Sequence, residues 1–492
     1  MSAHAGSRGA LAAAATLLTC AVVGASVALD PRVFVAIPAL GALAAVCLFA
    51  YRRPRGALTL AFLLVLVAGT KFSIRSETAS LSGTVDASVV MELGLYALAA
   101  VITGLTVLAP GFPARRLGRM EWPLVAFTAF AFASTVWSDA PTFTFVRSGQ
   151  LAILVALGMT AVRRLDVAGT MHALGTMVVA YALACTAVTV AFPGTRVTST
   201  VALAGDRFSW FAMHSISTSM FTATSILYLA SIALFVPGGW RQRRAGIPVW
   251  LALVPLAAVM VAANSRGPLF ALLGALAAMV AAAIRPVASL AIAAAAACAL
   301  FVGSIAGVTP ESLLEDAARS SSSVSTIVLR GQDVREFGTL TGRTELWADL
   351  LPLHFARPVA GYGYQASRAV LLRLRPWAGH AHNAVLQTLL DVGWVGTLLL
   401  WVPFFAACLR PRVRPPFGGP PRWEGAAVFA ASVFMLLNSV SDVSPAGGPA
   451  FETLLFLCTI MTADRLAARE LPAGRVVRSA GVPVWDAASR PA

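Results

Sequence analysis

The chain of 492 residues alternates long apolar segments with short connections in which arginine is the main charged residue. The apolar segments are about 15 to 25 residues long, and an α-helix of about 20 residues crosses the hydrocarbon core of a bilayer. They lie at 10–29, 33–50, 57–71, 88–109, 121–137, 145–162, 170–192, 213–236, 247–263, 267–284, 286–304, 384–408, 425–441 and 449–464. We therefore expect an all-α, polytopic membrane protein with about 12–14 transmembrane helices.

Arginines mark every second connection along this pattern. They precede the first segment, recur in alternate connections from Arg52 to Arg422, and return in the C-terminal tail. Short cytoplasmic loops carry an excess of positive residues, so the alternation predicts cytoplasmic N- and C-termini. The remaining connections then face outward, including the long one at 305–383. The first segment could instead be a cleaved signal peptide, because Ser26-Val27-Ala28 resembles a cleavage site.

The long outer connection at 305–383 contains a helical pattern of its own. Leu346, Leu350 and Leu353 fall on one side, which predicts a short amphipathic helix along the outer membrane face, and Pro358 breaks the chain after it. The expected divisions are an N-terminal transmembrane bundle at 1–199, central spans at 200–304, this outer loop at 305–383, C-terminal spans at 384–464 and a cytoplasmic tail at 465–492.

The composition agrees with a membrane protein and argues against nucleic acid or zinc as a binding partner. Hydrophobic residues make up 58% of the chain, charged residues 12%, and the mean hydropathy is +0.78, which excludes an ordinary soluble domain. The net charge of +15 does not indicate nucleic-acid binding, because the basic residues are spread over the connections. The six cysteines lie within or beside apolar segments, so neither disulfides nor a zinc site is expected.

Polar residues beside the membrane on the expected outer side are the candidates for chemistry. Arg266 lies in the tight connection Asn264-Ser265-Arg266-Gly267-Pro268, where its guanidinium could bind phosphate through two hydrogen bonds or anchor the helix end in the interface. Arg207 stands beside Asp206 and could form a surface ion pair, and His214 is typical of a core histidine. Charges near a bilayer are costly without a partner or ligand, so the outer cluster suggests an anionic ligand.

His382-Asn383 stands at the start of a long apolar segment. At helical spacing His382 shares one face with Gly393 and Gly396, which places it at a helix start, where the helix dipole favours neutral imidazole. Neutral imidazole can accept a proton, although a histidine there is also often a polar residue bonded to nearby carbonyls. His380 lies before the helix and is the weaker candidate. Without a P-loop, a G-x-S-x-G elbow or a metal-binding pair, we expect neither a metal nor another cofactor.

Three separated stretches share an order and spacing that point to one family. They are Ser265-Arg266-Gly267 opening a span, Gly342-Arg343-x-x-x-Trp347 followed by Pro358-x-x-Gly361-x-Gly363, and His382-Asn383-x-x-Leu386-Gln387-x-Leu389-x-x-x-Gly393-x-x-Gly396. Together, over roughly residues 200–400, they resemble the O-antigen ligase and polymerase family of bacterial envelope enzymes. The stretch after Arg207 departs from the usual family pattern, since it continues as Trp210-Phe211-Ala212-Met213-His214.

The resemblance implies a multi-span glycosyltransferase at the outer face of the bacterial cytoplasmic membrane. Such an enzyme moves a glycan from an undecaprenyl diphosphate carrier to a hydroxyl of an acceptor glycan or glycolipid, without a metal. Carried onto this chain, Arg266 and Arg207 would bind the diphosphate, and His382 would activate or position the acceptor hydroxyl. The possible supporting residues are Arg343, His380, Asn383 and Ser265.

Two questions stay open at the level of sequence. The motifs do not separate a ligase from a repeat-unit polymerase or a protein glycosyltransferase. The alternative outside the family is a transporter or flippase of the cell envelope. A coupled carrier is expected to show inverted repeats and broken helices, and the sequence shows neither pattern.

Overall fold

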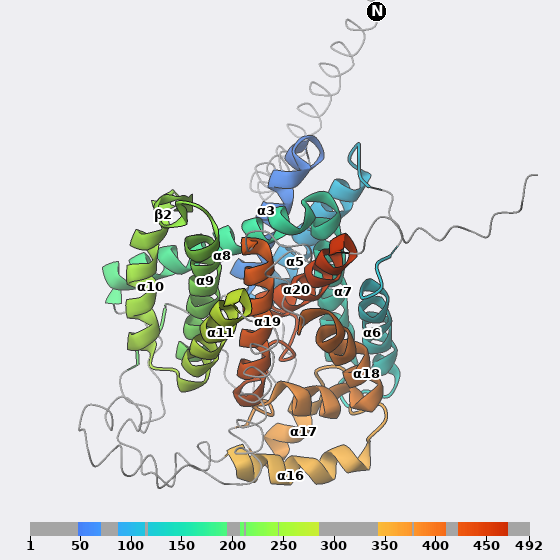
Figure 1. Cartoon of the computed structure of the whole chain (residues 1–492). Helices are drawn as coiled ribbons and strands as arrows, with labels where there is room; N and C mark the ends of the chain where they lie inside the picture. Colours follow the sequence, from blue (N-terminus) through green and yellow to red (C-terminus); the bar gives the residue numbers. More distant parts are fainter. Residues whose placement is uncertain are drawn as a thin grey trace, which may run out of the picture.

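The computed structural model describes residues 48–69, 87–113, 117–193, 207–210, 213–244, 246–284, 343–375, 378–409 and 422–470. Within these ranges the chain forms a bundle of α-helices, with two helices lying across one end of it (Figure 1). Several predicted features lie outside the described residues. They are the segments at 10–29 and 286–304, most of the segment at 33–50, the outer loop before residue 343, and the tail after residue 470.

The other predicted apolar segments coincide with helices of the bundle. Their bounds are α3 (Pro54–Ala68), α5 (Ala87–Leu108), α6 (Glu121–Ala133), α7 (Pro141–Arg164), α8 (Asp166–Ala191), α9 (Ser215–Phe235), α10 (Val249–Ala263), α11 (Arg266–Ile284), α18 (Ala384–Cys408), α19 (Trp423–Ser441) and α20 (Phe451–Glu470). Among the described residues, 7 helices are long and apolar enough to cross a membrane, and shorter apolar helices accompany them. The prediction of an all-α polytopic membrane protein is confirmed.

One end of the bundle is rich in arginine and is tied together by a buried carboxylate. Glu121, at the start of α6, accepts hydrogen bonds from Arg163 of α7 at 2.7 Å and from Arg465 of α20 at 2.8 Å. At the same end, β1 (Arg243–Arg244) and β2 (Ile247–Pro248) pair as a short antiparallel hairpin after the 3-10 helix η4 (Gly239–Arg241). A buried charge is costly unless it is paired, and the two guanidiniums meet that need.

Two helices, α16 (Arg343–Ala356) and α17 (Ser367–Leu374), lie across the opposite end of the bundle (Figure 1). Leu346 and Leu350 of α16 are buried in a small core with Leu371 of α17, and Leu353 packs against it. On the other side of α16, the Phe355 side chain is 71% exposed. The predicted amphipathic helix is therefore present, with the three leucines on its inward side.

The helix α18 is interrupted at Gly393, whose backbone is not helical: it adopts φ 61° and ψ −165°. The turn at 358–363 fills the break: the N–H groups of Trp394 and Tyr362 donate to the carbonyls of Pro358 at 2.8 Å and Leu390 at 2.9 Å. Helical spacing predicted that Gly393 shares one continuous helical face with His382, and that prediction is wrong. The broken helix was also not foreseen, but its free backbone groups are taken up by this turn, as a membrane protein requires.

Glycines bring α11 and α19 into close contact. A side chain at Gly267 would overlap the side chain of Ser441, and one at Gly274 would lie 2.6 Å from Leu437. The two glycines are seven residues apart and so share one face of α11. Their small size allows the backbones of α11 and α19 to approach, which is the usual way in which helices pack in a membrane.

The break in α18 generates a prediction about stability. Gly393→Ala should lower the free energy of unfolding by about 2–4 kcal/mol, because the added Cβ enters a backbone region open mainly to glycine and overlaps Val359. The measurement is thermal unfolding of the purified protein in detergent. Gly149→Ala in α7 is the matched control, since a Cβ there meets nothing within 4 Å. Equal stability of the two variants would contradict this account of the break.

Candidate active site at the end of α19

The C-terminal end of α19 is the point where the candidate residues meet. Arg343 of α16 donates from Nη1 to the carbonyl oxygen of Ser441 at 2.6 Å, and Asn383 donates from Nδ2 to the carbonyl oxygen of Val440 at 3.3 Å. The last carbonyls of a helix have no partner within it and carry partial negative charge, so a guanidinium and an amide are suitable donors. The end of α19 thereby fixes both the start of α16 and the start of α18.

Ser265 and Arg266 reach the same place from α11. Asn264, with φ 42°, ends α10 in a left-handed conformation, and α11 begins at Arg266, two residues later. Because Gly267 packs directly against Ser441, the first turn of α11 lies beside the Ser441 carbonyl that Arg343 binds. Ser265 is 3% exposed, and its hydroxyl oxygen has no hydrogen-bond partner among the described residues.

Arg207 is held next to the turn between α10 and α11. The N–H of Phe208 donates to the carbonyl oxygen of Ala262 at 3.1 Å, and the N–H of Trp210 donates to Oγ1 of Thr218 at 3.2 Å. These bonds tie the segment 207–210 to the end of α10 on one side and to α9 on the other. Asp206, which the sequence analysis considered as a partner for Arg207, lies outside the described residues.

The three arginines form one electropositive cluster. Arg266 interacts electrostatically with both Arg207 and Arg343. Burial lowers the pKa of Arg343; the nearby carboxylate of Asp442 opposes this shift, and the charge of Arg207 adds to it. Burial also lowers the pKa of Arg207. Like charges that are partly removed from water repel each other, so the cluster favours an anion placed between the guanidiniums.

His382 stands at the start of α18, as predicted, but it precedes the N-cap residue and so lies outside the helix. Asn383 is the N-cap, and its Oδ1 accepts hydrogen bonds from the N–H groups of Val385 and Leu386, each at 3.0 Å. His382 has φ 52°, a left-handed conformation that is uncommon for a residue other than glycine. Its ring lies 4.0 Å, centroid to centroid, from that of His380. The backbone conformation, and not helical spacing, sets the direction of the His382 side chain.

The surroundings keep His382 neutral. Burial lowers its pKa to about 2, and the neighbouring His380, Arg343 and His214 add to the shift. These effects favour the neutral imidazole that the sequence suggested, and burial, rather than a helix dipole, is the main one. His214 is exposed rather than part of the core; it caps α9, and its Nδ1 accepts from the N–H of Ile216 at 3.3 Å. Among the described residues, no group of three or more His, Cys, Asp and Glu side chains could hold a metal ion.

Asp442 is a site residue that the sequence analysis did not identify. It follows α19 directly, accepts a hydrogen bond from the N–H of Ser444 at 3.2 Å, and acts electrostatically on Arg343. The signal was present in the polar stretch Asn438-Ser439-Val440-Ser441-Asp442 at the end of an apolar segment. Membrane helices commonly end in polar residues, so this stretch indicates a helix boundary and does not by itself identify a functional site.

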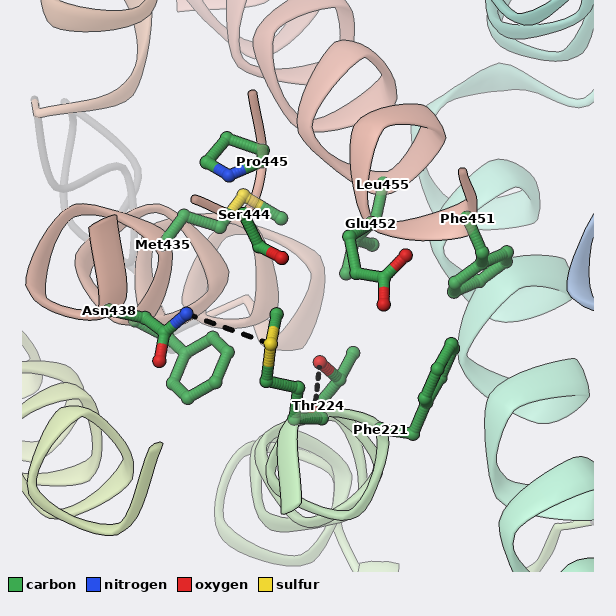
Figure 2. A pocket seen from close by; sticks show the side chains of 11 residues that line it. Phe221, Thr224, Met435, Asn438, Ser444, Pro445, Phe451, Glu452 and Leu455 are labelled. Carbon is green, nitrogen blue, oxygen red and sulfur yellow. Dashed lines mark hydrogen bonds between the residues drawn. The ribbon is translucent and has the colours of Figure 1, made fainter. Parts of the chain in front are cut away.

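A mainly apolar cavity lies one helical turn away from Ser441 (Figure 2). Figure 2 shows the side chains of Phe221 from α9, Asn438 from α19 and Glu452 from α20 around it. The Asn438 amide makes one long contact, 3.7 Å from its Nδ2 to the sulfur of Met220, while its Oδ1 is buried without a partner among the described residues. The cavity therefore has apolar walls, and the Asn438 carbonyl oxygen is able to accept a further hydrogen bond.

Part of the chain matches a known protein family. Residues 251–401 match a family model described as O-Antigen ligase. The matched segment contains Ser265, Arg266, Arg343, His380, His382 and Asn383, while Arg207 and Asp442 lie outside it. No curated protein and no solved structure matched the chain. The resemblance to the O-antigen ligase and polymerase family is thus confirmed over this segment. Together with the long apolar helices, the match indicates a multi-pass bacterial membrane protein.

The neutral state of His382 can be tested directly. Its rate of modification by diethyl pyrocarbonate should change less than twofold between about pH 7.5 and 5.5, whereas that of N-acetylhistidine should fall about tenfold as its imidazole is protonated. Peptide mass spectrometry of the intact, folded protein gives the rate at His382 alone. A fall that follows N-acetylhistidine would show that the site does not hold the imidazole neutral.

The lowered pKa of His382 also predicts reduced folding stability below about pH 6.5, where the unfolded state binds a proton that the folded state does not.

Proposed function

We propose that the protein transfers a glycan from an undecaprenyl diphosphate carrier to an acceptor hydroxyl at the outer face of the bacterial cytoplasmic membrane. The reaction would need no metal ion and would invert the anomeric carbon. The observation that carries the proposal is the meeting of Arg207, Arg266 and Arg343 with His382 around the end of α19. The O-Antigen ligase match over residues 251–401 supports it.

The arginine cluster suits the leaving group of this reaction. When the bond between the anomeric carbon and the diphosphate breaks, negative charge develops on the departing oxygen, and fixed guanidiniums in a partly dehydrated site stabilise it. Arg266 and Arg207 are assigned to the diphosphate. Ser265 would add its buried hydroxyl, which has no hydrogen-bond partner in the part of the chain that the structure describes, and the N-terminus of α11 would add partial positive charge.

His382 is assigned to the acceptor. The oxygen of the acceptor hydroxyl attacks the anomeric carbon, and its proton passes to the neutral imidazole as the new bond forms. An imidazole with a pKa of about 2 is a weak base. Burial is the largest cause of that low pKa and the charge of Arg343 is a smaller one, so a bound diphosphate that neutralises the arginine cluster would raise the pKa in part. Donor binding would thus prepare His382 for proton transfer. Arg343, His380 and Asn383 would support these roles.

Two features support an outward-facing site. The opposite end of the bundle carries Arg163, Arg244 and Arg465, and positive residues favour the cytoplasmic side. At the site end, α16 leaves Leu351 and Phe355 exposed at 47% and 71%, as expected of a helix lying at a membrane surface. With this orientation, the described C-terminal end of α20 faces the cytoplasm. The same site could serve a ligase or a repeat-unit polymerase.

The assigned roles predict the behaviour of two variants. Arg266→Ala should lower the transfer rate by about 10²–10³-fold through loss of charge stabilisation, and His382→Ala should lower it by about 10²–10⁴-fold through loss of the base. The measurement uses full-length protein in lipid nanodiscs with a membrane extract from a strain that lacks this protein. A ladder of lengthening glycans would identify a polymerase, and a single product would identify a ligase.

Arg373→Ala is the matched control for Arg266→Ala. Arg373 is an exposed arginine of α17 at the same end of the bundle, and its Nε donates within its own helix to the carbonyl oxygen of Ala369 at 3.1 Å. Its replacement should leave transfer within about twofold of the wild type. Transfer at the wild-type rate by folded His382→Ala or Arg266→Ala protein would refute the assigned role of that residue.

A further inference from the structure

We propose that Gln387 is a positioning residue for His382, that it acts through the backbone of Ala381, and that Asp391 fixes the orientation of the Gln387 amide. This inference rests on the proposed transfer reaction, in which His382 receives the proton of the acceptor. The side chain of Gln387 forms hydrogen bonds with Ala381, Ser367 and Asp391. Its effect would pass through the peptide that joins His380 to His382.

Ala381 is held from both sides of its backbone. Its N–H donates to Oε1 of Gln387 at 2.9 Å, and its carbonyl oxygen accepts from Nε1 of Trp347 at 2.8 Å. Gln387 comes from the first turn of α18, whereas Trp347 comes from α16, which lies across the end of the bundle. Two independent elements therefore fix the residue between the two histidines.

The hydrogen bonds of the Gln387 amide require one orientation. Its Nε2 donates to Oδ2 of Asp391 and to Oγ of Ser367, each at 2.9 Å. A carboxylate oxygen can only accept, so Nε2 must face Asp391 and Oε1 must face Ala381. Asp391 is itself held by the N–H of Ser367, which donates to its Oδ1 at 3.1 Å. These side chains are 1–3% exposed, and a fully satisfied buried network of this kind is rigid.

The network around Gln387 also affects the backbone conformation of His382, in addition to the stability of the fold. A left-handed backbone at φ 52° costs free energy for any residue with a side chain, and it persists only where the surroundings impose it. Asn383 fixes the chain after His382 by capping α18, and the Ala381 contacts fix it before. Without the second constraint the backbone could relax, and the imidazole would move relative to the acceptor. A displacement of about 1 Å in a reacting group can cost about 100-fold in rate.

The decisive test exchanges the two partners. Gln387→Met removes the acceptor for Ala381, and Asp391→Asn sets an amide donor against either Gln387 Nε2 or the Ser367 N–H. Each should lower kcat for transfer by about 100-fold with the donor KM within about twofold, because the arginines that bind the donor are untouched. The double variant Gln387→Glu/Asp391→Asn restores complementarity, since the new carboxylate accepts from Ala381 and from the new amide. It should recover kcat to within about fivefold of the wild type.

A second readout does not depend on transfer. Modification of His382 by diethyl pyrocarbonate, followed by peptide mass spectrometry, should be faster in Gln387→Met and Asp391→Asn and should return toward the wild-type rate in the double variant. Wild-type kcat in either single variant would overturn the proposal. So would a folded double variant that recovers neither kcat nor the modification rate of His382, because the network would then contribute packing alone.

The hydrogen bond from Trp347 to the Ala381 carbonyl can be removed without changing the buried carboxylate of Asp391. Trp347→Phe removes only the indole N–H, and it should lower kcat by about tenfold, the value of one hydrogen bond. Trp401→Phe is the matched control, since its indole Nε1 donates to Thr388 at 3.2 Å, deeper in α18, and its kcat should stay within about twofold. Equal rates for the two variants would contradict the proposal even if Gln387 and Asp391 variants failed to fold.

Failure of the positioning role can be distinguished from failure of the proposed function. If wild-type protein transfers no glycan in the extract, the proposed function fails, while the modification of His382 still reports on the Gln387 network. If wild-type protein transfers glycan, His382→Ala is inactive and Gln387→Met is fully active, the proposed function stands and the positioning role fails. All variants are compared in the full chain, after their thermal unfolding in detergent has been matched to that of the wild type.

Discussion

The site depends on the unpaired carbonyl groups at the C-terminal end of α19. A helix end in or near a membrane needs hydrogen-bond donors, and here Arg343 and Asn383 supply them from α16 and from the start of α18. Gly267 allows α11 to lie against the same turn, which brings Arg266 beside it. One local requirement of the backbone thus joins elements that are distant in sequence. The two groups that satisfy it, Arg343 and Asn383, are those proposed to support the residues that bind and activate the substrates.

The break in α18 is a second constraint on the structure. It helps to hold in place the donors that the end of α19 requires. The turn at 358–363 inserts between the two halves of α18, so the layer formed by α16 and α17 is fixed to the bundle by backbone hydrogen bonds. Gly361 and Gly393 are required because a Cβ at either position would overlap the opposite backbone. This attachment holds Arg343 and Trp347 above the start of α18, where one binds the end of α19 and the other binds Ala381.

The sequence predicted the helices well because hydrophobic length and arginine spacing are local properties. The same holds for α16, whose leucines at 346, 350 and 353 face inward as their spacing predicted. Arg266 and His382 were identified from separated motifs, and the structure brings both to the end of α19. The break at Gly393, the left-handed backbone of His382 and the role of Asp442 were missed, because each depends on contacts between segments that no local pattern encodes. Functional residues often sit at such departures from local rules.

The electrostatics of the site connect its two halves. Three partly buried arginines repel one another, and Arg343 also contributes to the low basicity of His382. A dianionic diphosphate would relieve both effects at once, since it offsets the positive charge and raises the proton affinity of the imidazole. Burial, the largest cause of the low pKa of His382, would remain when a donor is bound, so the donor would raise the proton affinity of the imidazole only in part. Such coupling would disfavour attack before the leaving group is in place, and it requires only that the same charges act on both groups.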